Sequence, residues 1–280
     1  MGWSLFKRLE VILVVVCLCV TFGVYARGMQ VINNTAATEM RRVTEDSIQT
    51  LQVRMNTYLQ SLNAAAGMMH TSENLEYDDF EVFVDSLNLQ ENLPGLSGIG
   101  FIEAVPSAQM PAYVADLRTN GLTDFSVHPK TDSAVKYIIK YIAPIATNAE
   151  ALGLDITFEK GRREAAERAR DMRSPQLTQR IVLVQDETKQ PGFLLLNPVF
   201  YQKGPREGEF RGWVYSPFVG KKAMQNLTLN QSKMYDFQVY EGIGTDPEML
   251  IHGSDLSDEV AGQYSTQYTT SFFGRPWTIH

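Results

Sequence analysis

Residues 181–201 read IVLVQDETKQPGFLLLNPVFY, and this stretch indicates the fold more clearly than its surroundings do. Its two apolar runs, Ile181–Gln185 and Gly192–Tyr201, have the length and the β-branched and aromatic content of strands. The polar loop from Asp186 to Pro191 lies between them. Two short apolar runs on either side of such a loop predict an antiparallel hairpin.

Similar runs lie on both sides of the hairpin. Further strands are predicted at Leu96–Val105, Phe125–Pro129 (a short edge strand halted by proline), Tyr137–Ile145, Gly212–Phe218, Phe237–Tyr240, Met249–His252, Thr266–Phe272 and Pro276–His280. Amphipathic spacing predicts helices between them, over Asp78–Leu89, Pro111–Leu117, Glu159–Arg173 and Lys221–Leu229. On the helix over 159–173, Arg162 falls on the alanine face, one turn from Ala166. Helices inserted between strands of antiparallel sheets make an α+β fold.

A long helix precedes the strands. From Met29 to Met69 there is no proline and only one glycine, Gly67. Apolar residues repeat there with heptad spacing, at Ile48, Leu51, Met55, Tyr58, Leu62, Ala65 and Met69. Two interpretations stay open: the seam packs on its own domain, or it forms a dimer of signalling helices. They are compatible, since a helix has a face for each.

The N-terminal segment is apolar, and Val11–Ala26 contains no charged residue. It is slightly shorter than the roughly 20 residues of a full span, and Leu9 extends it. Lys7 and Arg8 precede it, which places the N-terminus in the cytoplasm by the positive-inside rule. We therefore expect a single transmembrane helix in contact with lipid. A cleaved signal peptide is the alternative, and both interpretations export the remainder.

Composition excludes several classes of function. The net charge of -7 lacks the basic face that a nucleic-acid partner requires. Both cysteines, Cys17 and Cys19, lie in the apolar segment, so no disulfide or thiolate zinc site is expected beyond it. The histidines do not show metal-ligand spacing, and no nucleotide-binding or hydrolase motif is present. No catalytic residue, metal site or cofactor is predicted, and an exported sensor fits better than a hydrolase.

One stretch resembles a known family. The runs PIATN at 144–148 and ALGLD at 151–155 are followed by Arg162-Arg163, Ala166, Ala169-Arg170-Asp171, Thr178, LVQ at 183–185, GFLL at 192–195 and PVFY at 198–201. In order and spacing these residues resemble the CHASE domain, the sensory domain of membrane histidine kinases, diguanylate cyclases and plant cytokinin receptors. The likeness covers roughly residues 75–216.

The resemblance implies a long stalk helix followed by two PAS-like lobes. The expected order is a cytoplasmic N-terminus (1–8), a transmembrane helix (9–26), a stalk helix (27–72), a membrane-distal lobe (73–216) and a membrane-proximal lobe (217–280) that is incomplete. It also implies a receptor in the bacterial inner membrane, with the bulk of the chain in the periplasm. A kinase or cyclase output module would lie outside this chain. The expected function is binding of an unknown small molecule, relayed through a homodimer; the alternative is an interaction scaffold without a ligand.

A small-molecule pocket needs apolar walls and a few oriented polar groups. Seven residues of the matching segments are candidates: Tyr141, Asp155, Arg162, Thr178, Phe193, Leu195 and Asn197. Cytokinin receptors place an aspartate near the position of Arg162, so the resemblance argues against cytokinin as the ligand. The competing interpretation is structural, because Tyr141, Phe193 and Leu195 suit a sheet core and Asp155 suits a cap.

Overall fold

The computed structural model describes residues 2–71, 75–186, 188–225, 237–253 and 265–280. Two compact units are distinguished, one made of Met1–Asp46 with Ser257–Thr266 and the other of Ser47–Leu256 with Gln267–His280. Each is described by itself below. The second unit contains both sheets and the candidate site.

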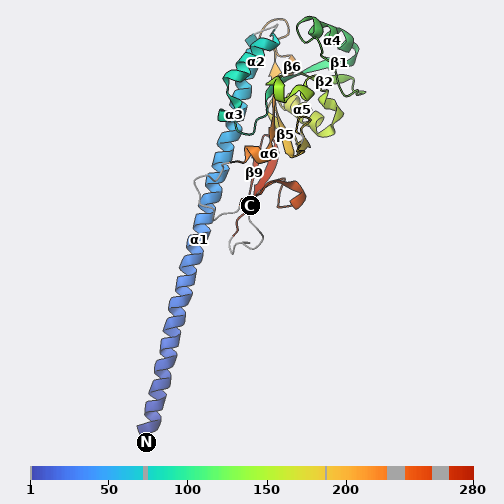
Figure 1. Cartoon of the computed structure of the whole chain (residues 1–280). Helices are drawn as coiled ribbons and strands as arrows, with labels where there is room; N and C mark the ends of the chain where they lie inside the picture. Colours follow the sequence, from blue (N-terminus) through green and yellow to red (C-terminus); the bar gives the residue numbers. More distant parts are fainter. Residues whose placement is uncertain (1, 72–74, 187, 226–236, 254–264) are drawn as a thin grey trace. The chain divides into compact units, whose positions relative to one another are not determined.

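The first unit contains the N-terminal part of helix α1 (Gly2–Thr71), shown in blue in Figure 1. Its side chains from Ile12 to Val24 are exposed and mostly apolar. By length and composition, this is one helix of the described chain that could cross a membrane, although a signal sequence meets the same criteria. The continuous helix agrees with the prediction from Met29–Met69, since no proline interrupts it.

In the second unit, six strands form an antiparallel sheet in the order β2-β1-β6-β5-β3, with β4 also paired to β5. The bounds are β1 (Ile99–Pro106), β2 (Val135–Ala143), β3 (Gln176–Leu177), β4 (Ile181–Val182), β5 (Pro191–Phe200) and β6 (Phe210–Val219). The predicted hairpin between residues 181–185 and 192–201 is present, because Ile181 pairs with Gly192. Its first strand is only two residues long, and β5 makes its longest pairing with β6.

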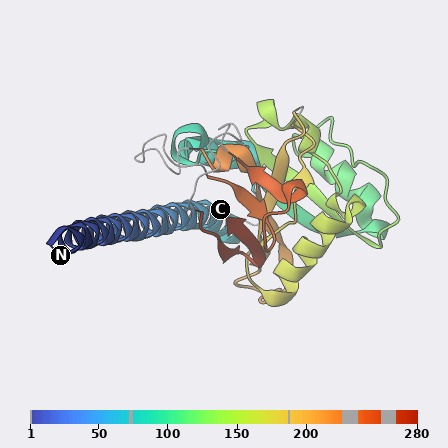
Figure 2. The ribbon, with the colours of Figure 1, turned by 90° about the horizontal axis from the view of Figure 1, so that it is seen from below.

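The C-terminal part of α1 covers one face of this sheet, and α5 (Lys160–Met172) covers the other (Figure 2). The strand pleat explains the division, because successive side chains point to opposite faces. In β5, Phe193 and Leu195 belong to the core that includes α1, while Leu194 and Leu196 belong to the core beneath α5.

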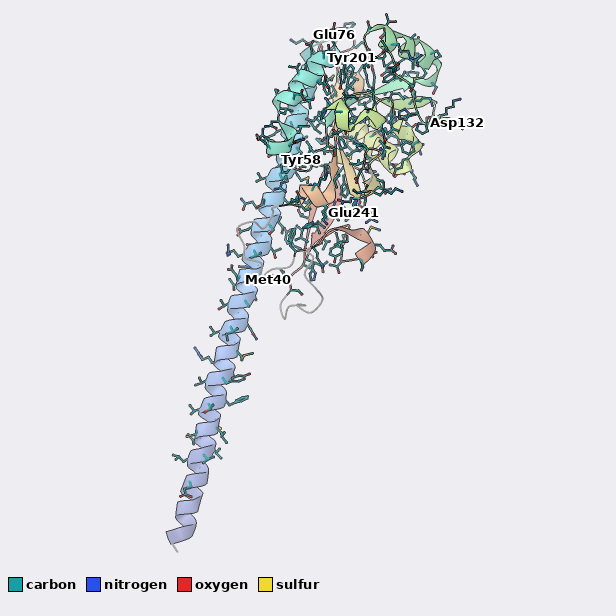
Figure 3. All side chains as sticks on the ribbon, in the orientation of Figure 1. Met40, Tyr58, Glu76, Asp132, Tyr201 and Glu241 are labelled. Carbon is teal, nitrogen blue, oxygen red and sulfur yellow. The ribbon has the colours of Figure 1, made fainter. Side chains whose placement is uncertain are left out.

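The heptad seam of α1 is used inside the chain. All seven of its residues are buried, and they pack with both sheets in one continuous core. Tyr58, labelled in Figure 3, is fully buried and donates a hydrogen bond to the Pro94 carbonyl. The first of the two interpretations of the seam is therefore the observed one, and a dimer would have to use another face of α1.

A second antiparallel sheet follows, in the order β8-β7-β10-β9. Its strands are β7 (Val239–Glu241), β8 (Leu250–His252), β9 (Tyr268–Phe272) and β10 (Arg275–Ile279). Trp277 of β10 is fully buried and lies against Phe193 of the first sheet, with ring centroids 5.1 Å apart. Two antiparallel sheets behind a long helix confirm the predicted α+β class.

Shorter elements complete the fold. They are α2 (Tyr77–Ser86), α3 (Leu89–Asn92), α4 (Met110–Thr119), α6 (Gly220–Ala223) and the 3₁₀ helices η1 (Ser107–Gln109), η2 (Ile145–Thr147), η3 (Ala149–Ala151), η4 (Ile156–Phe158) and η5 (Pro247–Met249). In Figure 1, α2 lies alongside the end of α1, and Phe80 of α2 is fully buried in the shared core. The predicted helix over 221–229 is only partly described, since residues 226–229 lie outside the described part.

One predicted strand was wrong. Phe125–Pro129 is a loop that makes a single isolated bridge, between His128 and Leu154. The His128 N–H donates to the Gly153 carbonyl, and the Asp155 N–H donates to the His128 carbonyl. These two bonds tie the loop to the chain just before η4 rather than to a sheet edge.

Candidate functional site

A hollow of about 490 Å³ opens beside the first sheet, on the side of α5. Two segments line it. Lys130, Thr131, Asp132 and Ser133 come from the chain before β2, and Thr157, Phe158 and Arg163 come from η4 and the start of α5. The hydrogen bonds that His128 makes with residues 153 and 155 hold the two segments near each other. Figure 3 labels Asp132 at the outer side of this region, away from α1.

Asp155 lies behind this lining and is fully buried. Its Oδ1 accepts hydrogen bonds from the backbone N–H groups of Tyr137 and Thr157, both at 3.1 Å, and from the Thr157 hydroxyl at 2.8 Å. Its Oδ2 accepts from the Thr131 hydroxyl and lies 3.5 Å from Nζ of Lys136. Every side of the carboxylate is thus occupied by donors, as a buried charge requires.

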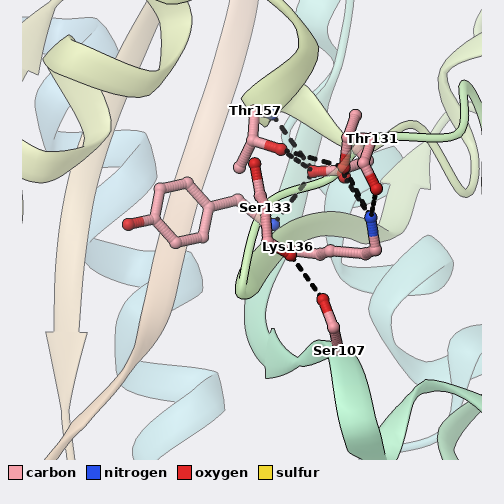
Figure 4. Close-up of polar contacts among 7 residues, drawn as sticks. Ser107, Thr131, Ser133, Lys136 and Thr157 are labelled. Carbon is pink, nitrogen blue, oxygen red and sulfur yellow. Dashed lines mark hydrogen bonds and ion pairs between the residues drawn. The ribbon is translucent and has the colours of Figure 1, made fainter.

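Local sequence explains the arrangement. Asp155 has an extended backbone and caps η4, with its side chain accepting from the Thr157 N–H. Aspartate is favoured at such a position because its oxygen satisfies an N–H at the helix start. Lys136 is the second residue of β2, and its ammonium also donates to the carbonyl and hydroxyl oxygens of Thr131. Figure 4 shows Thr131, Thr157 and Lys136 converging.

Arg162 lies on the alanine face of α5, where helical spacing placed it, and its side chain is only 3% exposed. Its Nε donates to Glu159 at 2.6 Å, and one terminal nitrogen donates to the Val182 carbonyl of β4 at 2.7 Å. Its guanidinium also lies 5.3 Å from the ring centroid of Phe158, a pocket residue. Arg162 therefore packs against Phe158 on the side away from the hollow and helps to hold that ring in place.

Tyr215 lies in the same core as the alanine face of α5. Burial raises the pKa of its phenol well above the ordinary range, and the charge of Arg162 opposes that shift. Its hydroxyl is buried and makes no hydrogen bond within the described residues. The phenol is therefore neutral at physiological pH.

The other candidates lie elsewhere. Tyr141, Phe193 and Leu195 belong to the core that α1 shares with the sheet, and the Tyr141 hydroxyl donates to the Leu75 carbonyl at 2.8 Å. Asn197 on β5 donates to Asn63 of α1 at 2.9 Å. The Thr178 hydroxyl accepts a hydrogen bond from the Leu194 N–H at 3.0 Å, so this side chain satisfies a backbone donor of β5.

The seven predicted residues do not form one constellation. Asp155 and Arg162 lie behind the hollow, while Tyr141, Phe193, Leu195 and Asn197 lie on the opposite face of the sheet. Sequence reasoning missed the lining itself, which consists of residues 130–133 with Thr157, Phe158 and Arg163. The available signal was the polar run KTDS before a strand, which reads equally well as an ordinary loop. Within the described residues no group of His, Cys, Asp or Glu could hold a metal ion.

Comparison with known proteins adds the family. The model of the CHASE domain matches residues 73–252, which is more than half of the chain. No curated protein matches the chain.

Solved structures of similar fold are sensory domains of receptors. An extracellular ligand-binding receptor from Desulfohalobium retbaense has 16% identity and a TM-score of 0.52, covering 85% of this chain and 39% of its own. Methyl-accepting chemotaxis protein X has 10% identity and a TM-score of 0.51, covering 89% and 97%. The ligand-binding domain of the Pseudomonas aeruginosa amino acid chemoreceptor PctC, in complex with GABA, has 10% identity and a TM-score of 0.48, covering 82% and 92%.

At these identities the first two likenesses show the fold alone. The chain spans less than half of the first receptor's length. The family match and the two antiparallel sheets behind a long helix agree, and together they identify an extracytoplasmic sensory region that is not itself catalytic. The chain belongs to the CHASE domain family.

Proposed function

We propose that this chain is the ligand-sensing region of a membrane receptor and that its ligand is a small molecule bound in the hollow beside Asp155. The observation that carries the proposal is the construction of that hollow. The fully buried Asp155 orients the Thr131 and Thr157 hydroxyls that line the hollow. An incidental depression of the surface would not need such an arrangement. Its volume falls within the range of about 300–1,000 Å³ that is usual for ligand sites.

The placement in the cell is part of the same proposal. Residues 9–26 would span the bacterial inner membrane, with residues 1–8 in the cytoplasm and 27–72 forming the stalk. A distal lobe at 73–216 and a proximal lobe at 217–280 would lie in the periplasm. A histidine kinase or diguanylate cyclase would supply the output from outside this chain.

The relay would run through the contacts between α1 and the sheets. Asn63 joins α1 to β5, and Arg54 donates to the backbone carbonyls of Ala223 and Gln225 at the end of α6. A ligand shifts the receptor only if it binds one arrangement of these elements more tightly than another. Both sheets share one core with α1, so a rearrangement of either would reach the helix.

The dimer of the proposal would use a second seam on α1. Four exposed residues with heptad spacing lie on the far side of α1 from the buried seam: Gln49, Val53, Asn56 and Gln60. Between Ser47 and Met69 the only charged residue is Arg54, and its guanidinium bonds α6. A helix face turned to water normally carries Lys and Glu, so an uncharged exposed face favours contact with a second copy.

Ligand binding is tested by a thermal-shift screen of the full chain in detergent against a broad library of small polar metabolites. A ligand that binds the folded state raises the unfolding midpoint by mass action. The screen is repeated with Asp155→Asn, which disturbs the lining, and with Glu164→Gln, which changes an exposed pair. A hit weakened only by Asp155→Asn supports the proposal. No hit in the library would favour the scaffold interpretation.

The dimer is tested by disulfide cross-linking in vesicles, in a chain whose Cys17 and Cys19 are replaced by alanine. Cysteine at Val53 or Gln60 should cross-link, whereas cysteine at Thr50, which is exposed but off the seam, should not. Equal cross-linking at Thr50 would remove the seam from the proposal.

A further inference from the structure

Of the three hydroxyl groups in the lining, those of Thr131 and Thr157 point their protons away from the hollow, toward Asp155, and this limits what a ligand can offer them. A hydroxyl carries one donor and two acceptor lone pairs. Thr157 donates its proton to Asp155 at 2.8 Å, and Thr131 donates its proton to the other carboxylate oxygen. Lys136 already donates to Thr131, so Thr131 is left with one lone pair and Thr157 with two. Toward the hollow, both residues act only as acceptors.

Two of the other five lining residues, Lys130 and Arg163, are cationic. Lys130 is exposed and Arg163 is half-buried, and neither side chain makes an ion pair within the part of the chain that the structure describes. Asp132 is the single carboxylate among the lining residues. Arginine binds carboxylates through two parallel N–H bonds, which makes Arg163 the stronger anchor for an anion.

Phe158 adds an apolar wall. Its side chain is 44% exposed although Arg162 packs against the ring. A large apolar side chain left open at the edge of a polar hollow is suited to cover a hydrocarbon portion of a ligand.

We propose that the ligand of this site is a small carboxylate that also carries a hydrogen-bond donor, as an amino acid or a hydroxy acid does. The carboxylate lies against Arg163 and Lys130, and the amino or hydroxyl group donates to Thr157, Thr131 and Asp132. The proposal rests on the proposed function and adds the chemical class to it. The ligand needs both poles, the carboxylate and the hydrogen-bond donor, because an acid without a donor leaves the lone pairs of the threonine hydroxyls unmatched.

The test uses matched sets of probes on the full chain in detergent, with binding measured by calorimetry. Each set contains an amino acid, its hydroxy acid, the acid lacking both groups, and the amino-acid amide. One set, for example, is phenylalanine, 3-phenyllactate, 3-phenylpropionate and phenylalaninamide. All twenty side chains are sampled. In at least one set, the first two probes should bind about tenfold or more tightly than the last two, since each of those lacks one pole.

Variants assign the poles. Arg163→Gln should weaken binding of the amino acid about tenfold and leave binding of the amide unchanged. Arg168→Gln, on the same helix but outside the hollow, should change neither affinity. Thr157→Val should weaken binding of the amino acid and leave binding of the acid without a donor unchanged. Thr157→Ser, which keeps the hydroxyl, should restore the affinity. The unliganded unfolding midpoint of each variant establishes that it folds.

Two results overturn the inference. In the first, a donorless acid or an amide binds as tightly as its amino acid. In the second, no set binds although the broad library gives a hit of another class, which leaves the sensory function standing and removes the ligand class. If the library gives no hit either, the proposed function fails together with the inference.

Discussion

Replacing Asp155 with asparagine tests how strongly the buried carboxylate holds the lining of the hollow. The amide oxygen can take the place of Oδ1 and keep the three bonds from Tyr137 and Thr157. The amide nitrogen then takes the place of Oδ2, where it faces two donors, the Thr131 hydroxyl and the Lys136 ammonium. The flipped amide is worse, because its nitrogen would face three donors.

The magnitude follows from burial. Asp155 is fully buried and the side chain of Lys136 is 13% exposed, so solvent does little to screen the loss. Removing one partner of a buried pair costs about 3–5 kcal/mol. Lys136 keeps two oxygens of Thr131 as acceptors, which places the change near the lower limit, at about 3 kcal/mol. For a unit of about 200 residues this lowers the unfolding midpoint by roughly 6–12 °C.

The assay is urea unfolding of the full chain in detergent, followed by tryptophan fluorescence. Trp213 is buried in the core beneath α5 and Trp277 in the second sheet. Lys136→Met is the partner variant, and it should also cost about 3 kcal/mol, because the fully buried carboxylate keeps four donors but loses its counter-charge.

Glu164→Gln is the matched control, since the Lys160–Glu164 pair is exposed by 80% and 46% and should contribute below about 0.5 kcal/mol. If Asp155→Asn cost less than about 1 kcal/mol, or no more than this control, the carboxylate would not be the centre of the lining.

Other changes should have equally definite outcomes. Tyr215→Phe removes a buried hydroxyl without a partner in the described residues, so stability to urea should stay level or rise by about 1 kcal/mol; a loss would reveal a bound water. Leu62→Ala, at a fully buried site on α1, should cost about 2–5 kcal/mol, while Val53→Ala on the exposed side should cost below about 0.5. Burial, and then the charge of Arg211, lower the pKa of His70 below 6.5, so the folded state favours its neutral form. Its contribution is present above pH 6.5 and is lost as the pH falls through the lowered pKa, and His70→Gln should flatten that part of a stability profile against pH.

Most of the strands could be predicted from the sequence because apolar runs and turn residues delimit them. The run Tyr137–Ile145 corresponds to β2, and Gly212–Phe218 corresponds to β6. Phe125–Pro129 failed for a local reason. Its composition suits a strand, but its backbone groups bond the turn before η4, a pairing that no periodicity in the sequence reveals.

The candidate site was less predictable. Helical counting placed Arg162 on the alanine face, and the structural alternative for Asp155, a cap, is the role that the geometry shows. Neither argument could identify the lining, because residues 130–133 are brought to Thr157, Phe158 and Arg163 by long-range contacts: the backbone bonds of His128 and the bond from Thr131 to Asp155. Polar loop residues carry no periodic signal that distinguishes a pocket wall from a solvated turn.

The strand β5 shows why the apolar candidates could not be assigned to a face. A strand with one face in water alternates between apolar and polar residues, and the alternation reveals which residues point inward. β5 is covered on both faces, by α1 with the second sheet and by α5, so Phe193 through Leu196 are uniformly apolar. Choosing Phe193 and Leu195 over Leu194 and Leu196 as pocket residues therefore had no basis in periodicity. The structure places the chosen pair on the α1 side, and the alternative pair on the side where the hollow opens.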